Sequence, residues 1–364
     1  MALSKDIRKS FPVLRNTVYA NTATSGLINE GLLEWRQEHD LDFLIGGSEA
    51  KAETHHLLAK TRATVARFFN FTAENVALVP SFSQGLNLLL EGLPPSESIL
   101  LLKGDYPSLN WPFESRDFNT THIPIGPELE QRIYEEIKLN HHTVFACSAV
   151  QWLNGLKVEF EFIQTLKKDF PNLLIIMDGT QFCGSDDFDF GKSGVDVMGA
   201  SGYKWLLSGY GNAFLMVKPE VQNRFQLRSS GFGSGRNAKY LKDGRTFCKH
   251  LEPGHLDSLN FGSLQYSMNF LMDIGLDNIG KHNQELSKTF KTVALEYHLL
   301  EPYVAHRKQH STIFNIKGDK VLYEKLLSKN IICVQRGEGI RLSFHFYNTI
   351  SDVNDVLTVV KSHL

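Results

Sequence analysis

A lysine in the second half of the sequence has the surroundings of a reactive amine. Lys204 lies in the run MGASGYKWLLSGYGN (198–212), which is apolar, aromatic and rich in glycine. Burial in such a setting would disfavour the ammonium form, lower the pKa of the amine and make it a nucleophile toward an aldehyde. The alternative is a surface lysine that extends its charge into solvent, and this run alone does not decide between the two.

An aspartate at the end of an apolar run could hold a ring nitrogen. Asp178 lies in IIMDGTQ (175–181), whose apolar part is typical of a buried strand. Ligands bind at the carboxyl ends of strands in a doubly wound sheet, and a carboxylate there can pair with a pyridine nitrogen and keep it protonated. Gln181 could donate a hydrogen bond to a phenolic oxygen of the same ring. Alternatively, Asp178 caps a helix and Gln181 makes a plain capping contact.

A third segment could bind a phosphate group. PSFSQGLN (80–87) follows the apolar run VALV and opens an apolar helix. The free amides and the dipole of a helix N-terminus attract anions, so the Ser83 hydroxyl and the Gln84 amide are the first choices for phosphate contacts. Ordinary helix capping is the alternative, and because the motif is short it is the more common explanation for such residues taken alone.

A fourth segment, near the C-terminus, offers a guanidinium group. Arg341 lies in RGEGIRLSFHFYNTISD (336–352), where apolar and polar residues alternate as in a strand. Its planar fork suits a carboxylate, such as that of an amino acid, although a surface salt bridge is the ordinary alternative. Thr349 and Asp352 have the spacing of a capping box and predict a final helix.

The composition argues against several classes of partner. Of the 364 residues, 42% are hydrophobic and 21% charged, which allows a sizeable buried core. The formal net charge is −2 and no long basic run occurs, so we expect no nucleic-acid partner and no binding to an anionic membrane surface. No apolar stretch reaches about 18 residues, which argues against a membrane-spanning helix.

The cysteines, the histidines and the N-terminal residues predict a cytoplasmic protein without a metal site. The four cysteines are widely spaced and form no CxxC pair, so we expect reduced thiols. The first residues lack the apolar core of a secretory signal, in agreement with a cytoplasmic location. The adjacent histidine pairs lack the spacing of a metal-binding helix, and neither a P-loop nor a dinucleotide-binding glycine motif is present.

Short apolar runs alternate with stretches of helical periodicity in the first two thirds of the chain. We expect helices near 51–69, 84–92 and 159–169. The expected strands are 76–79, 99–102, 143–147, 173–177 and 213–217. This alternation predicts an α/β fold with a mostly parallel sheet covered by helices on both faces.

The last third of the chain has a different pattern. Residues 250–300 read as a loop followed by one long helix, and two or three strands and a final helix come after it. We therefore expect a large domain over residues 18–260 and a small α+β domain over residues 261–364. Residues 1–17 are expected to pack with the small domain.

Taken in order, these motifs resemble the class V aminotransferase and cysteine desulfurase family of fold-type I enzymes that use pyridoxal 5'-phosphate. The resemblance covers nearly the whole chain and implies a mixed, mostly parallel seven-stranded sheet between helices, a smaller C-terminal domain and a homodimer with shared active sites. The segments that carry it are VYANTATSG (18–26), SFSQGLN (81–87), DYPS (105–108), SAVQWLNG (148–155), MDGTQ (177–181), SGYKW (201–205) and RLSFHFYNT (341–349).

The resemblance assigns a role to each matching residue. Lys204 matches the lysine that holds the cofactor as a Schiff base, Asp178 the partner of the pyridine nitrogen, and Arg341 the arginine that binds the substrate carboxylate. Gln181 and Gln151 match positions that bond the phenolic oxygen, and Tyr106 matches the side chain on the ring face. The implied phosphate contacts are Ser83, the Gln84 amide, Ser201 and Tyr203. By a looser match, His255 or Asn260 reaches the neighbouring subunit's phosphate.

Two departures from the family argue against sulfur transfer. Desulfurases carry a nucleophilic cysteine on a loop shortly before the arginine strand, but residues 334–340 contain none, and Cys333 is expected to be buried and inert. Desulfurases also commonly have a histidine where this chain has Tyr106.

The reaction that we expect is therefore transamination at the α-carbon of an amino acid, with a 2-oxo acid as acceptor. Lys204, once displaced by the substrate, would be the general base, and Asp178 would stabilise the protonated ring. A lyase or epimerase is the alternative, followed by a cysteine desulfurase or selenocysteine lyase. A non-catalytic binding protein with the same fold ranks last.

Overall fold

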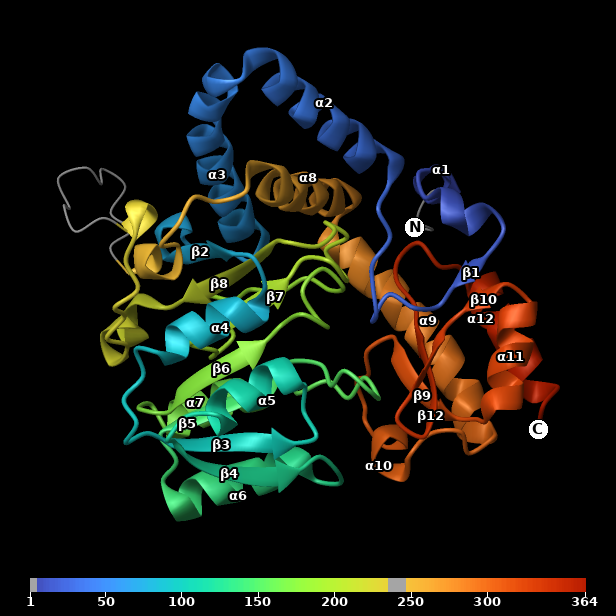
Figure 1. Cartoon of the computed structure of the whole chain (residues 1–364). Coiled ribbons are helices and arrows are strands. Elements are labelled where there is room, and N and C mark those ends of the chain that lie inside the picture. The colour runs from blue at the N-terminus through green and yellow to red at the C-terminus, as the bar shows by residue number, and fades with distance from the viewer. Residues whose placement is uncertain (1–4, 235–246) are drawn as a thin grey trace.

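A large twisted sheet forms the centre of the computed structural model, which describes residues 5–234 and 247–364 (Figure 1). Its seven strands lie in the order β2-β8-β7-β6-β5-β3-β4. Their bounds are β2 Val76–Val79, β3 Ser98–Lys103, β4 Asn119–Pro124, β5 Val144–Ser148, β6 Leu174–Asp178, β7 Val197–Ser201 and β8 Ala213–Val217. β8 runs antiparallel to β2 and β7, and the other pairs are parallel. The predicted mixed, mostly parallel seven-stranded sheet is confirmed.

Helices cover both faces of this sheet because its strands carry apolar side chains on both sides. One face packs on α4 (Phe82–Leu90) and α5 (Pro107–Glu114), with Leu86, Leu89 and Phe113 in the shared core. The other face packs on α3 Ser48–Phe68, α6 Leu129–Asn140, α7 Phe160–Asp169 and α8 Ser258–Ile274. Burial on both faces explains why the strands read as continuous apolar runs.

The prediction of one long helix in residues 250–300 is wrong. Two helices, α8 (Ser258–Ile274) and α9 (Leu276–Glu296), are separated by Gly275, whose φ of 92° breaks the helical path. α8 packs against α3 and against α2 (Glu30–Gly46) beside the large sheet. The predicted boundary at residue 260 falls inside α8. The division into two domains stays a proposal, and these contacts would place the boundary after α8.

A smaller α+β unit lies beyond α9 (Figure 1). Its elements are α10 Pro302–Ala305, β9 Ile313–Lys317, α11 Lys320–Ser328, β10 Ile331–Ile332, β11 Val334–Arg336, β12 Gly339–Ser343 and α12 Ile350–Lys361. β12 pairs antiparallel with both β11 and β9. Phe290 of α9 packs on Phe314 and Phe344 in the core of this unit.

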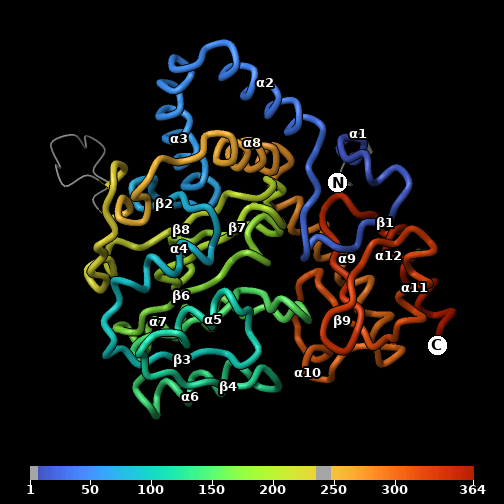
Figure 2. Tube along the Cα trace, viewed as in Figure 1, coloured from blue at the N-terminus to red at the C-terminus, as the bar shows by residue number. Residues whose placement is uncertain are grey.

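The N-terminal segment packs against this C-terminal unit (Figure 2). β1 (Val18–Tyr19) pairs in parallel with β10. Arg8, in α1 (Lys5–Lys9), forms an ion pair with Asp352 at 2.6 Å. These contacts place β1 and α1 against the last third of the chain. The assignment of residues 1–17 to the small domain stays a proposal, and residues 1–4 are outside the described part.

The remaining local features fit the sequence patterns. Thr349 and Asp352 form the predicted capping box at the start of α12. Short 3-10 helices are η1 Pro12–Arg15, η2 Ala73–Asn75, η3 Pro219–Arg224, η4 Phe232–Ser234 and η6 Cys248–Leu251. Within residues 5–234 and 247–364, none of the helices is both long and apolar enough to cross a membrane.

Candidate active site

The carboxyl ends of three adjacent parallel strands meet at one edge of the large sheet. Asp178 ends β6, Ser148 lies opposite it at the end of β5, and Ser201 ends β7. Lys204 follows three residues after β7. The pocket at this edge is lined by Tyr106, Ser148, Val150, Trp152, Asp178, Thr180, Gln181 and Lys204. Topology thus brings Lys204 and Asp178 together, as the strand-end argument predicts.

Lys204 is a buried amine. Its side chain is 4% exposed, so the alternative of a surface lysine is wrong. Burial lowers the pKa of Lys204 to about 8, against the opposing influence of Asp178, and the positive charges of Arg341 and Arg336 lower it further. Nζ lies 5.2 Å from the centre of the Tyr106 ring. At neutral pH an appreciable fraction of this amine is uncharged, as a nucleophile requires.

The loop after Lys204 holds the lysine in place through its own hydrogen bonds. Ser208 Oγ donates to Asn212 Oδ1 at 2.6 Å, and the Ser208 amide donates to the Gly202 carbonyl at 3.1 Å. Gly26 packs so closely that a Cβ there would lie 1.9 Å from the Lys204 carbonyl oxygen. The Gly26 amide donates to the Tyr203 carbonyl at 2.8 Å. The glycines of this region are therefore needed for close backbone packing around the lysine.

Asp178 is a buried carboxylate beside this amine. Burial raises the pKa of Asp178 to about 6, although the hydrogen bonds from Thr180 and the charge of Lys204 lower it. Its Oδ1 accepts from the Thr180 amide at 2.8 Å. Turns rather than a helix follow it over residues 179–184, so the helix-capping alternative is wrong. The carboxylate stays mostly ionised at pH 7, as pairing with a protonated ring nitrogen requires.

Asp105 is a site residue that sequence reasoning missed. Its Oδ1 accepts from the Ser148 hydroxyl at 2.6 Å and from the Tyr106 amide at 2.7 Å, and its Oδ2 accepts from the Ser148 amide at 2.7 Å. Burial raises the pKa of Asp105 against these hydrogen bonds. The carboxylate therefore fixes Tyr106 over Lys204. Its position two residues after the apolar strand β3, inside the DYPS motif, was the available signal.

The start of α4 meets the end of β7. Ser201 Oγ accepts from the Phe82 amide at 3.0 Å, which leaves the Ser201 proton available for donation. The helix N-cap is Ser81, and its hydroxyl accepts from the Gln84 amide at 3.2 Å. The Gln84 amide, predicted to be free for a phosphate, is thus already partnered, whereas within the described residues Ser83 has no side-chain partner. Ser83 and Ser201 remain the predicted phosphate contacts.

Tyr203 and the two glutamines predicted to bind the cofactor also hold the chain together. Tyr203 stacks on Tyr210, with ring centres 4.5 Å apart. Gln181 Nε2 donates to the Ala23 carbonyl at 3.0 Å, and its Oε1 accepts from Trp205 at 2.8 Å. Gln151 Oε1 accepts from two amides of the turn that follows it. Gln181 lines the Lys204 pocket and Gln151 shapes the adjoining turn. Their contacts to a cofactor stay predictions.

Arg341 is a buried guanidinium that no carboxylate of the described residues neutralises. It is 3% exposed, so the alternative interpretation of Arg341 as part of a surface salt bridge is wrong. Nη1 donates to the Trp152 carbonyl at 2.8 Å and Nη2 to Thr24 Oγ1 at 2.7 Å, while Nε has no partner within the described part of the chain. Burial lowers the pKa of Arg341 to about 10, and Arg336 lowers it further. A buried cation without a counter-charge favours binding of an anion.

Arg336 is a second cation near this site, and sequence reasoning did not single it out. Its charge lowers the pKa of both Lys204 and Arg341. It lies on β11, which pairs with the strand of Arg341, and its side chain is exposed. Its place on the hairpin that carries Arg341 could have identified it as a site residue from the sequence.

His255 and Asn260 lie away from the Lys204 pocket of their own chain. The His255 side chain is exposed and packs on the Phe232 ring, 4.8 Å between centres. Asn260, in the first turn of α8, accepts from Arg36 at 3.0 Å and donates to Asp257 at 2.7 Å. Their reach to a neighbouring subunit stays a prediction.

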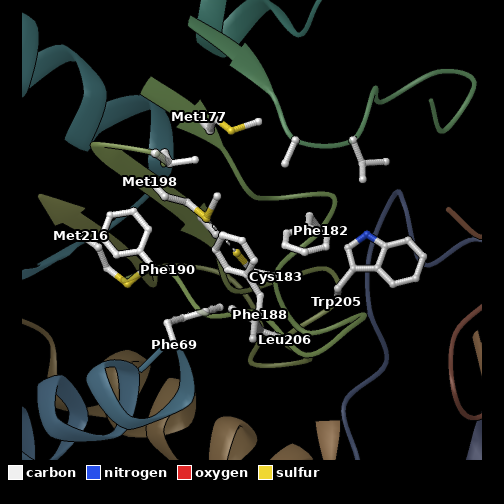
Figure 3. Close-up of a cluster of buried hydrophobic side chains, with 14 of the residues drawn as sticks. Phe69, Met177, Phe182, Cys183, Phe188, Phe190, Met198, Trp205, Leu206 and Met216 are labelled. Carbon is white, nitrogen blue, oxygen red and sulfur yellow. Dashed lines mark hydrogen bonds between the residues drawn. The ribbon is translucent and has the colours of Figure 1, made fainter. Parts of the chain in front are cut away.

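All four cysteines are buried. Burial raises the pKa of Cys333 to about 12 and also raises the pKa of Cys147 and Cys183. Figure 3 shows Cys183 among methionine and aromatic side chains of the core. These three thiols are therefore poor nucleophiles. Within the described residues, no group of three or more histidine, cysteine or acidic side chains could hold a metal ion.

Comparison with known proteins identifies one family. A model described as aminotransferase class V matches residues 21–356. A protein named probable cysteine desulfurase from Ureaplasma parvum is 24% identical, over 98% of this chain and 97% of its own length. An uncharacterized aminotransferase, YcbU of Bacillus subtilis, is also 24% identical, over 98% of this chain and 96% of its own length.

Solved structures share the whole fold at low sequence identity. An apo cysteine desulfurase from Thermococcus onnurineus superposes with a TM-score of 0.86 at 19% identity, covering 100% of this chain and 98% of the other. A cystine C–S lyase in complex with cysteine persulfide superposes with a TM-score of 0.83 at 19% identity, covering 96% and 98%. The expected fold is confirmed over the full length of the chain.

Proposed function

The chain belongs to the aminotransferase class V family, and we propose that it is a pyridoxal-phosphate enzyme that transfers the amino group of an amino acid to a 2-oxo acid. The observation that carries this proposal is the buried, unneutralised guanidinium of Arg341 within electrostatic reach of the Lys204 amine. The carboxylate of an amino acid could bind to Arg341 while its amino group reacts beside Lys204.

The donor set of the pocket fits this cofactor. Lys204 would hold its aldehyde carbon, Asp178 its ring nitrogen, and Ser83 with Ser201 its phosphate, while Tyr106 would lie on the ring face. When bound, the cofactor supplies an electron-withdrawing ring that stabilises negative charge at the substrate α-carbon. Among the described residues, the hydroxyl protons of Ser201 and Ser83 have no acceptor. Both could therefore be donated to a phosphate oxygen.

The side chains around the pocket would have different roles toward the substrate. Arg341 would bind the carboxylate and set the direction of the Cα–H bond, because the Trp152 carbonyl and Thr24 fix its guanidinium. The Lys204 amine, with a pKa of about 8, can take and return a proton near neutral pH. Trp152 lies edge-on to the Tyr106 ring, 5.9 Å between centres, and these two rings shield the amine from water.

A lyase is the second candidate, because the same lysine, aspartate and arginine would start either reaction. One neighbour in fold is a cystine C–S lyase, and breakage of a carbon–sulfur bond by elimination needs no thiol from the enzyme. A desulfurase that uses a nucleophilic cysteine is less well supported, since Cys333, Cys147 and Cys183 are buried with raised pKa values. Assembly as a homodimer, with His255 or Asn260 at the partner's site, is part of the same proposal.

A panel of single amino acids tests the reaction. The purified protein should absorb visible light through its cofactor. It should release about one equivalent of 2-oxo acid per chain from its best amino donor, and turn over only when a second 2-oxo acid is added. Ammonia release without an acceptor would favour the lyase, loss of optical purity an epimerase, and sulfide from cysteine a desulfurase. A protein without visible absorbance that binds no pyridoxal phosphate would overturn the proposal.

A further inference from the structure

A second, larger cavity lies beside the Lys204 pocket. Its volume is about 550 Å³, within the range of small-molecule sites. We call it the α9 cavity. It is lined by Val150, Lys157, Gln181, Phe182, Ser185, Asp186, Trp205, Gly280, Asn283, Gln284, Ser287, Lys288, Lys291, Thr292, Leu295, Lys308, Gln309, His310, Ser311 and Thr312.

The α9 cavity is separate from the Lys204 pocket but shares a wall with it. Val150 and Gln181 line both. Trp205 donates to Gln181 Oε1 at 2.8 Å. Trp205 and Phe182, whose side chains Figure 3 draws within the hydrophobic cluster, add apolar side chains to the lining of the cavity. The opposite side comes from α9 and from residues 308–312, which do not line the Lys204 pocket. Apart from Val150 and Gln181, the two sites are therefore lined by different residues.

The charge of this cavity is positive. All of the lining lies within the described residues, and it contains four lysines and one carboxylate, Asp186. Lys157 lies 3.1 Å from Asp186 and is neutralised by it. Lys291 donates to the Arg307 carbonyl, and Lys288 and Lys308 have no carboxylate partner within the part of the chain that the structure describes. Three lysines of the lining therefore have no carboxylate partner within the described residues, which leaves an excess of positive charge around the cavity.

A buried amide lies in the wall of the cavity. Asn283 is 5% exposed, and its Oδ1 has no hydrogen-bond partner among the described residues. Its Nδ2 donates to the Ser185 carbonyl at 2.8 Å, which fixes the orientation of the amide. This oxygen has almost no accessible surface, so Asn283 contributes to the wall of the cavity rather than offering an acceptor to its interior.

We propose that the α9 cavity binds a small organic phosphate that carries at least two negative charges. Several lysines around one space suit the spread charge of a phosphate, because the ammonium group is a point charge without a preferred fork geometry. The lining, all of it within the described residues, contains no arginine to grip a carboxylate with two hydrogen bonds.

Titration calorimetry on the cofactor-loaded protein tests this site, since the cofactor then fills the phosphate seat at Ser83. The probes are ADP and ribose 5-phosphate, with succinate as the carboxylate comparison. The variant is Lys288→Ala with Lys308→Ala, two exposed side chains whose loss leaves the core intact. The matched control is Lys281→Ala with Lys320→Ala, whose side chains are 71% and 80% exposed and do not line the cavity.

The expected result is saturable binding of at least one phosphate probe, one per chain. The affinity should fall roughly tenfold or more in the cavity variant and stay within about twofold in the control. Absence of saturable binding by both phosphate probes overturns the proposal. So does equal binding by the cavity variant and the unchanged protein. Succinate binding as tightly as the phosphates overturns the choice of ligand class.

Discussion

The Lys204 pocket and the α9 cavity both depend on lysine, but burial gives the amine a different character in each. Lys204 is 4% exposed, beside a carboxylate, and burial lowers its pKa to about 8. Lys288 and Lys308 are exposed at the edge of a polar cavity. The first environment lowers the pKa of the amine toward neutral pH, whereas in the second the side chains are exposed to solvent. The surroundings of a lysine, more than its presence in a pocket, decide its chemistry.

Lys204→Ala tests the first half of this comparison and has the largest expected effect. Turnover with the best amino donor should fall roughly 1,000-fold or more, and the visible absorbance of the bound cofactor should be lost, because the attachment point and the proton-transfer group are the same amine. Lys192→Ala, a lysine with a side chain that is 82% exposed, is the control and should behave as the unchanged protein. Normal activity of Lys204→Ala would exclude the proposed role.

Arg341→Lys asks whether the buried guanidinium binds the substrate carboxylate. We expect kcat/KM for the amino donor to fall roughly 10- to 100-fold, mainly through KM, since an ammonium group cannot reproduce the two parallel hydrogen bonds of a guanidinium. Steady-state kinetics with donor and acceptor varied separately measure this. Arg15→Lys, at a side chain that is 66% exposed, is the matched control. An unchanged KM in Arg341→Lys would contradict the assignment.

Asp105→Asn tests whether a second buried carboxylate positions the ring over Lys204. Loss of charge-assisted bonds to the Ser148 hydroxyl and two amides should lower the free energy of unfolding by roughly 1–3 kcal/mol. Denaturant unfolding measures this, with Asp117→Asn on the surface as control. A positioning role also predicts a changed absorbance maximum of the bound cofactor, which a purely structural role would leave unmoved.

The stability of the cofactor-free protein should depend on pH through the pair at the centre of the pocket. The folded pKa of Asp178, about 6, is above its ordinary value, so stability falls as pH rises from about 4 to 6. The folded pKa of Lys204, about 8, is below its ordinary value, so stability rises as pH increases from about 8 toward 10.5. Each change is on the order of 1–3 kcal/mol.

The matched double variant Asp178→Asn with Lys204→Met should show a flatter profile of unfolding free energy against pH. Denaturant unfolding at a series of pH values gives the comparison. A minimum near pH 7 that survives in the double variant would mean that other groups cause it.

Cys333→Ala extends the comparison from amines to thiols and has the smallest expected effect. Burial raises the pKa of Cys333 to about 12, so we expect kcat/KM to stay within about twofold. The lost side-chain volume should lower the free energy of unfolding by about 1 kcal/mol. Complete loss of activity with normal folding would point instead to a desulfurase that uses this thiol.

Sequence reasoning found the residues whose neighbours along the chain report on burial. Asp178 and Ser83 follow continuous apolar runs that became β6 and β2, and strand-end topology brought Asp178 to Lys204. It missed β4, where Ile123 is the one buried residue of a polar edge strand. It also missed β7, because Gly199 interrupts the apolar pattern, although Leu215 and Phe82 leave no room for a side chain there.

The sites that sequence reasoning missed depend on contacts between distant segments. Asp105 was visible in its motif, yet its partner Ser148 lies 43 residues away. The α9 cavity joins Lys157 with Lys288 and Lys308, which no local periodicity connects. The break at Gly275 was also hidden, because a single glycine is tolerated within many helices and only the packing of α8 and α9 on different units shows the change of direction.

The pairing of β1 with β10 has a consequence for synthesis of the chain. Val18 leaves the ribosome more than three hundred residues before its partner Ile331, so β1 stays without its neighbour while all of these residues are translated. The same N-terminal segment supplies Thr24, which holds Arg341. Contacts of such long sequence separation form slowly. The contact between Thr24 and Arg341 therefore forms only after translation has passed Arg341, and a product that ends before this residue would lack the proposed carboxylate-binding group.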